Sequence, residues 1–199
     1  MNRAAVVTVL DNAVTTYINK PGTYTGKMDG IVLITSNDVI LNQATVTGNL
    51  IVAQGAKGAS LYIKDTKVQG TIQINAAASE FLFEDSEIQV IAAAAGNISI
   101  LADAGTKVKE IILKTHAQGN IVNVAYGASV NRIESNADGV VIKGQGSVST
   151  VEVNGNNTAV DTSGTKLTLQ TGSTGVTSKG KKVIGDLTTG STVSGGRNR

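Results

Sequence analysis

One short phrase recurs along this chain at nearly constant spacing. The stretches GTKVKEIIL (105–113), GASVNRIES (127–135) and GSVSTVEV (146–153) each pass from a Gly to a Val, then through two polar residues to an aliphatic one. Aligning this phrase gives one apolar anchor per unit, at steps of 18 to 22 residues and a mean of about 20. The anchors are Val46, Val68, Ile88, Val108, Val130, Val148 and Leu167, with Leu187 continuing the series. Such a period is typical of proteins built from stacked structural repeats.

Within each unit, apolar residues alternate with other residues, as in LYIKD (61–65) and IQIN (72–75). A period of two is the signature of a strand. Turn sequences such as SND (36–38) and NADG (136–139) separate the strands and leave no room for crossover helices. An isolated rung could not bury its apolar edge, but a stack encloses a continuous aliphatic core. The sequence therefore predicts an all-β fold, a single-stranded parallel β-solenoid (β-helix) with about 20 residues per rung.

We expect three segments in this fold. Residues 1–29 form an N-terminal strand and cap region, residues 30–186 form the β-solenoid, and residues 187–199 form a Thr/Gly/Ser-rich tail. The anchors from Val46 to Val148 should stack as one inward column, with Phe81 and Phe83 also pointing inward. The strong bias of parallel crossover connections favours right-handed coiling.

Two other interpretations of the strand pattern remain open. An antiparallel sandwich uses similar strands, but it predicts no anchor that repeats near 20 residues. The stretch VIAAAAGNIS (90–99) could hold a helical turn, because Ala is the best helix former. Small residues that fill a narrow corner of the coil explain the same stretch equally simply, and we favour that interpretation.

Composition narrows the possible partners. The formal net charge of +2 gives no argument for nucleic acid, and the absence of Cys excludes disulfides, thiolate zinc sites and cysteine nucleophiles. The apolar stretch AAVVTVL (4–10) has seven residues, whereas a spanning helix needs about 20. It is better explained as a strand, so we expect no membrane span and recognise no signal peptide in this chain.

Residues 18–55, INKPGTYTGKMDGIVLITSNDVILNQATVTGNLIVAQG, carry a KPGTY segment followed by a G-x-V-x-I strand and a unit ending in GNLIV. This stretch resembles the start of the β-solenoid region of surface-layer-associated and other cell-envelope proteins of Firmicutes. Later units, such as SLYIKDTKVQGTIQIN (60–75), look like continuing coils of the same family. The resemblance covers roughly residues 15–155, and it implies an extracellular building block at a cell or spore surface.

A catalytic site must also be weighed, because solenoids can degrade polysaccharides with carboxylates that converge on one groove. The acidic stretch EFLFEDSE (80–87) is the best candidate, with Glu80, Glu84, Asp85 and Glu87. Asp65 aligns with Asp85 one period earlier, but its neighbours are lysines. We therefore expect a solvated outer face, no catalytic group, no cofactor and no metal. The single histidine, His116, lies in a turn sequence and is expected to be a surface residue.

Glycan binding ranks ahead of catalysis as an alternative, and carbohydrate sites commonly use exposed aromatic rings. Tyr62 and Tyr126 could point outward, whereas Tyr17 and Tyr24 belong to the N-terminal region, so no row of rings at one-period spacing exists. Asn97 and Asn156 begin sequences that match glycosylation acceptors.

The sequence thus favours a non-catalytic structural protein that assembles head to tail into an extracellular fibre or layer, with a glycan-binding adhesin or a β-helix enzyme as alternatives. Its partners would be further copies of itself, and also cell-envelope components or glycan. The ends of a solenoid carry unpaired strand edges, which must be capped or paired with another chain. The residues expected to make this self-association are Val7, Val9 and Val193.

Overall fold

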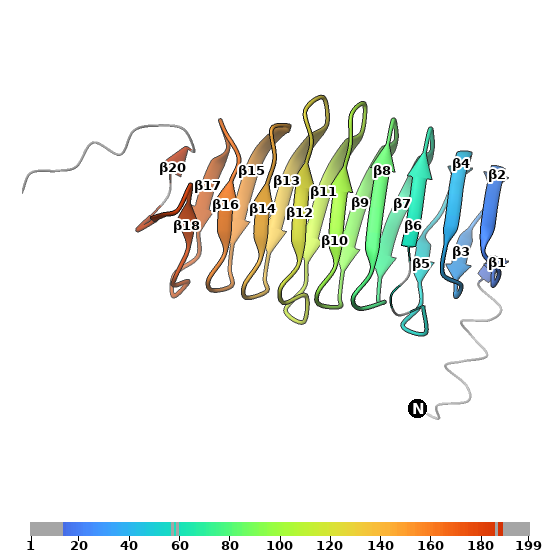
Figure 1. The fold of residues 1–199 in the computed structure, drawn as a ribbon, viewed down its shortest axis with the longest axis horizontal. Coiled ribbons are helices and arrows are strands. Elements are labelled where there is room, and N and C mark those ends of the chain that lie inside the picture. Colours follow the sequence, from blue (N-terminus) through green and yellow to red (C-terminus); the bar gives the residue numbers. More distant parts are fainter. Residues whose placement is uncertain (1–13, 57, 59, 186, 189–199) are drawn as a thin grey trace, which may run out of the picture.

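The chain winds into one elongated stack of strands (Figure 1). The computed structural model describes residues 14–56, 58, 60–185 and 187–188. Over these residues the regular structure consists of strands joined by turns and bends, in about eight turns of a β-solenoid. This confirms the predicted fold class and the period of about 20 residues.

Two series of parallel strands form the stack, and each rung contributes one strand to each series. The odd series is β1 Val14–Ile18, β3 Ile31–Ile34, β5 Leu50–Val52, β7 Lys67–Ile74, β9 Glu87–Ala93, β11 Lys107–Leu113, β13 Ser129–Ser135, β15 Ser147–Val153 and β17 Lys166–Leu169. The even series is β2 Gly22–Met28, β4 Val39–Val46, β6 Ser60–Lys64, β8 Glu80–Glu84, β10 Ser99–Ala102, β12 Ile121–Val124, β14 Val141–Lys143, β16 Ala159–Asp161 and β18 Thr177–Ser178. Two short strands follow, β19 Lys181–Lys182 and β20 Leu187–Thr188.

The predicted anchors form one inward column. In the parallel register, each anchor lies opposite the anchor of the next rung, and all are almost fully buried. The column contains Val46, Val68, Ile88, Val108, Val130 and Val148. The alternative of an antiparallel sandwich is therefore wrong for this chain, because every strand pair from β1 to β18 is parallel.

The recurring Gly-to-Val phrase of the sequence marks a corner of the coil. The chain turns this corner within β11, β13 and β15. In β11 the burial pattern alternates up to Val108, then Lys109 and Glu110 both face outward before alternation resumes at Ile111. The same break appears in β13 and β15. Two outward residues in succession rotate the strand to a new side of the coil, so the two polar positions of the phrase mark a corner.

Further inward columns fill the interior. One runs from Val39 through Leu61 and Phe81 to Ile100, and another pairs Ile63, Phe83 and Ala102. Phe81 and Phe83 are buried as predicted, and the small Ala102 lies beside the bulky Phe83 on the next rung. Of the Ala-rich stretch, Ala92 and Ala93 are buried residues of β9. This small-residue explanation fits better than the helical turn.

One turn of each rung also stacks in register. Its central residue has a positive φ, and its backbone N–H donates to the carbonyl just before the equivalent residue of the next rung. The donors are Gly58, Ala78, Asn97, Gly119, Gly139 and Asn157, and Gly175 is the equivalent residue at the last of these turns. At Gly175 a Cβ would lie 2.2 Å from the Asn157 Oδ1, so the side chain of one rung covers the bare backbone of the next.

The last rung corrects the sequence analysis. Leu167 lies opposite Val151, not Val148, so it belongs to the neighbouring inward column. Leu187 does not continue the parallel series, because β20 pairs with β17 in the antiparallel sense, with Leu187 opposite Leu167. β19 is also antiparallel, to β18. Both aliphatic residues fall at the expected interval, but Leu167 enters another column and the strand of Leu187 runs in the opposite direction.

A single polar residue interrupts the column that holds Leu113 and Val153. Ser135 lies between them in register, its side chain is fully buried, and its hydroxyl has no hydrogen-bond partner. Replacing Ser135 with Ala removes this unsatisfied group, so we expect stabilisation of about 1 kcal/mol in chemical denaturation. Ser149→Ala, at an exposed site on the next rung, should leave stability unchanged. A destabilised Ser135→Ala variant would contradict this account.

Candidate functional surfaces

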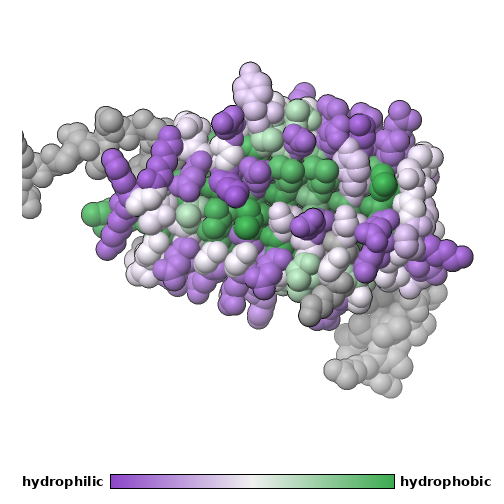
Figure 2. Space-filling view, in the orientation of Figure 1, coloured by the Kyte–Doolittle hydropathy of each residue, from purple (hydrophilic) through white to green (hydrophobic). Residues whose placement is uncertain are grey.

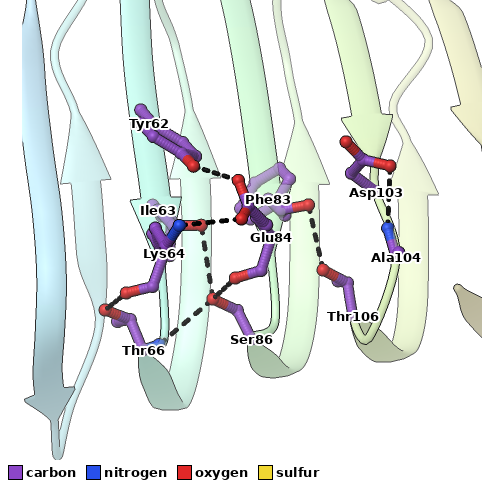
Figure 3. A network of polar contacts seen from close by, with 10 residues as sticks. All are labelled: Tyr62, Ile63, Lys64, Thr66, Phe83, Glu84, Ser86, Asp103, Ala104 and Thr106. Atoms are coloured by element: carbon purple, nitrogen blue, oxygen red, sulfur yellow. Dashed lines mark hydrogen bonds and ion pairs between the residues drawn. The ribbon is translucent and has the colours of Figure 1, made fainter.

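Of the acidic residues in the candidate catalytic stretch, Glu84 and Glu87 form ion pairs with lysines of the previous rung. The Lys64 Nζ lies 2.8 Å from the Glu84 Oε1, and the Tyr62 hydroxyl donates to the other oxygen of the same carboxylate (Figure 3). These bonds, first from Lys64 and then from Tyr62, lower the pKa of Glu84. The Glu84 carboxylate is therefore an ion-pair partner, and a general acid needs the opposite shift.

The other acidic residues of this stretch have different surroundings from Glu84. Glu87 pairs with Lys67 at 2.9 Å, and Glu80 is exposed at the start of β8. Asp85 and Asp65 are stacked turn residues with φ of 47° each, beside an open shallow groove. Within the described part of the chain, no three His, Cys, Asp or Glu residues gather as a metal site would need.

Behind this surface, a column of hydroxyls fixes the corner between the even and odd strands. The hydroxyls of Thr66, Ser86 and Thr106 donate to the carbonyl oxygens of Lys64, Glu84 and Phe83, at 2.7, 2.7 and 2.9 Å. The Ser86 hydroxyl also accepts the backbone N–H of Thr66 from the previous rung. All three residues are buried, so these bonds satisfy the bent backbone where the strand ladder is interrupted (Figure 3).

The most concentrated charge cluster lies on the odd series and was not predicted. Arg132 on β13 forms ion pairs with Glu110 and Glu152 of the two adjacent rungs and with Glu134 of its own strand. Bonds from Arg132, and then from Gln170, lower the pKa of Glu152. The signal was present in the sequence, since Glu110 and Glu152 lie one period on either side of Arg132. One guanidinium thus joins three rungs.

The histidine and the tyrosines lie in separate places. His116 is exposed in the turn after β11, as predicted. Tyr126 is 81% exposed in the turn after β12, and Tyr17 is 57% exposed on the first rung. Tyr62 is a half-buried outward residue of β6, and Tyr24 packs against the core. The structure therefore brings no two of these rings together as a platform.

The two glycosylation sequences differ in their surroundings. Asn97 is exposed at a stacked turn. The Asn156 side chain accepts bonds from Thr174 and donates to Asp138, so it forms part of the contacts between rungs. The residues expected to self-associate, Val7, Val9 and Val193, lie outside the described residues.

None of the described residues belongs to a helix long and apolar enough to cross a membrane.

We compared the chain with protein-family models, with curated proteins and with solved structures. It matches none of them.

Proposed function

We propose that this protein is a non-catalytic structural building block of a bacterial cell or spore surface, and that it assembles end to end into a fibre or layer. The observation that carries this proposal concerns the outer edge of the first rung, residues 14–28. β1 pairs with β3 and β2 pairs with β4, and neither has a second partner among the described residues. Unpaired edges of this kind are templates for pairing with another chain.

At the opposite end of the stack, two short antiparallel strands lie on the last rung. β20 pairs with β17 at Lys166 and Leu167, and β19 pairs with β18. We propose that the first rung of a neighbouring molecule docks beside these strands. A head-to-tail contact of this kind does not close on itself, so it produces filaments.

The stretch AAVVTVL (4–10) is the segment best suited to make the contact. It ends at Leu10, shortly before β1, and its apolar residues Val7 and Val9 share one face of the expected strand. Pairing with the terminal rung of the next molecule would satisfy backbone groups and bury aliphatic surface together. Val193, in the tail, lies near the other end of the chain and would contribute to the same junction.

The ion pairs on the surface support a structural role. The carboxylates at positions 84, 87, 110, 134 and 152 are held in ion pairs, most of them between rungs. These pairs add lateral stiffness to a stack whose backbone ladders are already continuous. A stiff rod of this kind suits a mechanical or spacing role at a cell surface.

Deleting residues 1–10 is expected to abolish oligomers and fibres while leaving thermal unfolding of the solenoid almost unchanged. Sedimentation velocity at rising concentration and electron microscopy would measure assembly, and circular dichroism would measure folding. The double variant Val7→Asp/Val9→Asp should have the same effect, because it places charge on the pairing face. Thr8→Asp is the matched control and should retain assembly. Full-length protein that stays monomeric, or truncated protein that still forms fibres, would refute the proposal.

A further inference from the structure

The C-terminal part of the chain is strongly basic. Residues 162–199 hold six of the 17 basic residues of the sequence and one of the 15 acidic residues, Asp186, which lies outside the described residues. Over the described residues of this part, the charged side chains are Lys166, Lys179, Lys181 and Lys182. Figure 2 shows hydrophilic side chains protruding from this end of the stack, at the left. The small net charge of the whole protein therefore results from an excess of acidic residues elsewhere.

Three of these lysines lie on one hairpin at the end of the even series, residues 177–182, which we call the terminal hairpin (Figure 1). Ser178 pairs with Lys181, so the loop between β18 and β19 has two residues, Lys179 and Gly180. Their φ angles of 49° and 73° are both positive, as a type I′ turn requires. Such turns favour Asn or Asp before the Gly, and lysine rarely adopts this conformation. Backbone preference therefore gives no reason for a lysine at the tip of the hairpin.

The charges of the terminal hairpin are accessible to a ligand. Its three lysines are exposed, and no described carboxylate forms an ion pair with any of them. The Lys179 Nζ donates to the neutral hydroxyl of Ser163 at 3.1 Å. Asp161 is the acidic residue beside the hairpin, and its carboxylate accepts the backbone N–H of Lys179 at 2.7 Å. Lys143 lies opposite Asp161 in the parallel register, so this corner of the stack keeps an excess of positive charge.

An exposed aliphatic side chain follows the terminal hairpin directly. Val183 extends the pairing by one residue, because its N–H donates to the Val176 carbonyl at 3.0 Å, and its side chain is buried. Lys182 and Ile184 lie on either side of this inward residue, so both face outward. Ile184 is 93% exposed, more than any other large hydrophobic side chain that the structure describes. Lysines beside an exposed aliphatic residue are the combination by which protein segments lie on an anionic lipid surface.

We propose that the terminal hairpin and Ile184 form a contact surface for an anionic lipid bilayer. The lysines meet phosphate groups of the lipid headgroups, and Ile184 enters the boundary between headgroups and acyl chains. A soluble polyanion would neutralise the lysines equally well, but it would leave Ile184 in water, so the aliphatic residue favours lipid. Each lysine contributes about a fivefold gain in affinity, so binding by one molecule is weak and depends on salt.

This contact is separate from end-to-end assembly, because a single molecule carries all of it. Only one consequence rests on the proposed function: the last copy of a filament leaves this end uncovered, so filaments should attach to lipid by one end in electron micrographs. Val7→Ser/Val9→Ser removes the apolar face proposed to assemble without changing the charge, and it should bind lipid as the wild type does. This variant separates a failure of assembly from a failure of the lipid contact.

Co-sedimentation of the full-length protein with vesicles tests the lysines. The protein should bind vesicles of equal parts phosphatidylglycerol and phosphatidylcholine, but not phosphatidylcholine alone, and high salt should release it. Lys181→Gln/Lys182→Gln should weaken binding about thirtyfold, because two lysines are lost. Lys107→Gln/Lys109→Gln removes two exposed lysines of β11 and should bind as the wild type does. Equal losses for the two double variants, or no binding by the wild type, would overturn the proposal.

A second variant tests the choice of lipid over a soluble polyanion. Ile184→Ser should weaken vesicle binding about tenfold, because the burial of the aliphatic side chain is lost. Its binding to soluble linear polyphosphate should equal that of the wild type. Tyr126→Ser removes an 81% exposed ring from the turn after β12, and vesicle binding should be unchanged. Wild-type vesicle binding by Ile184→Ser would make the hairpin a site for polyanions in general, and the lipid assignment would be wrong.

Discussion

Val108→Asp should destabilise the solenoid by several kcal/mol, the largest loss expected from any single substitution in the anchor column. Val108 lies between Ile88 and Val130 in register and is 2% exposed. A carboxylate at this position is surrounded by aliphatic side chains, with no cation to pair with it. Its desolvation would either cost this energy directly or force protonation of the group.

Urea denaturation followed by circular dichroism would measure this loss. Lys109→Asp is the matched control, because it introduces the same charge at the next residue, which is exposed. Exposed substitutions of this kind normally change stability by less than about 0.5 kcal/mol. A Val108→Asp variant that unfolds at the wild-type urea concentration would contradict the register of the column.

Phe83→Ala is expected to cost about 3 to 5 kcal/mol, through lost burial and the cavity that remains. Phe83 is fully buried between Ile63 and Ala102 of the adjacent rungs, and the small Ala102 cannot expand to fill the space. The strand ladders on both sides hold the backbone in place, which limits collapse around the cavity.

Leu82→Ala gives the internal comparison for this prediction. Leu82 is the preceding residue on β8 but points outward and is only half-buried, so its truncation should cost less than about 1 kcal/mol. The difference between the two variants measures the alternation of the strand directly. Similar losses for both would show that the inward and outward faces of β8 are wrongly assigned.

Fold prediction from this sequence succeeded where one physical constraint acts on every rung. The inward position must be apolar in each repeat, so Val46 to Val148 could be aligned from spacing alone. It failed at Leu167 and Leu187, where the last rung is shorter and the strand direction reverses. Spacing reports the length of a repeat, but it carries no information on strand direction.

The surfaces were harder to predict than the core. The acidic stretch was correctly expected to be a solvated face, because Lys64 and Lys67 lie one period from Glu84 and Glu87. The three-rung cluster of Arg132 requires the register of three strands, which residue spacing gives only to within a few positions. Likewise, Leu82 and Leu101 resemble core residues in the sequence, and only the fold shows that they face outward.

Because the turns stack in register, the length of the solenoid can change by whole rungs. Their positive-φ residues, such as Asn97 and Gly119, bond to the equivalent turn of the next rung and to no distant part of the chain. A unit of about 20 residues can therefore be duplicated or lost between two such turns, and the interface between the flanking rungs remains of the same kind. Each event would change the rod by one strand spacing, about 4.8 Å, at constant width. Lineages carrying this fold could thus adjust the reach of a surface rod without redesigning its core.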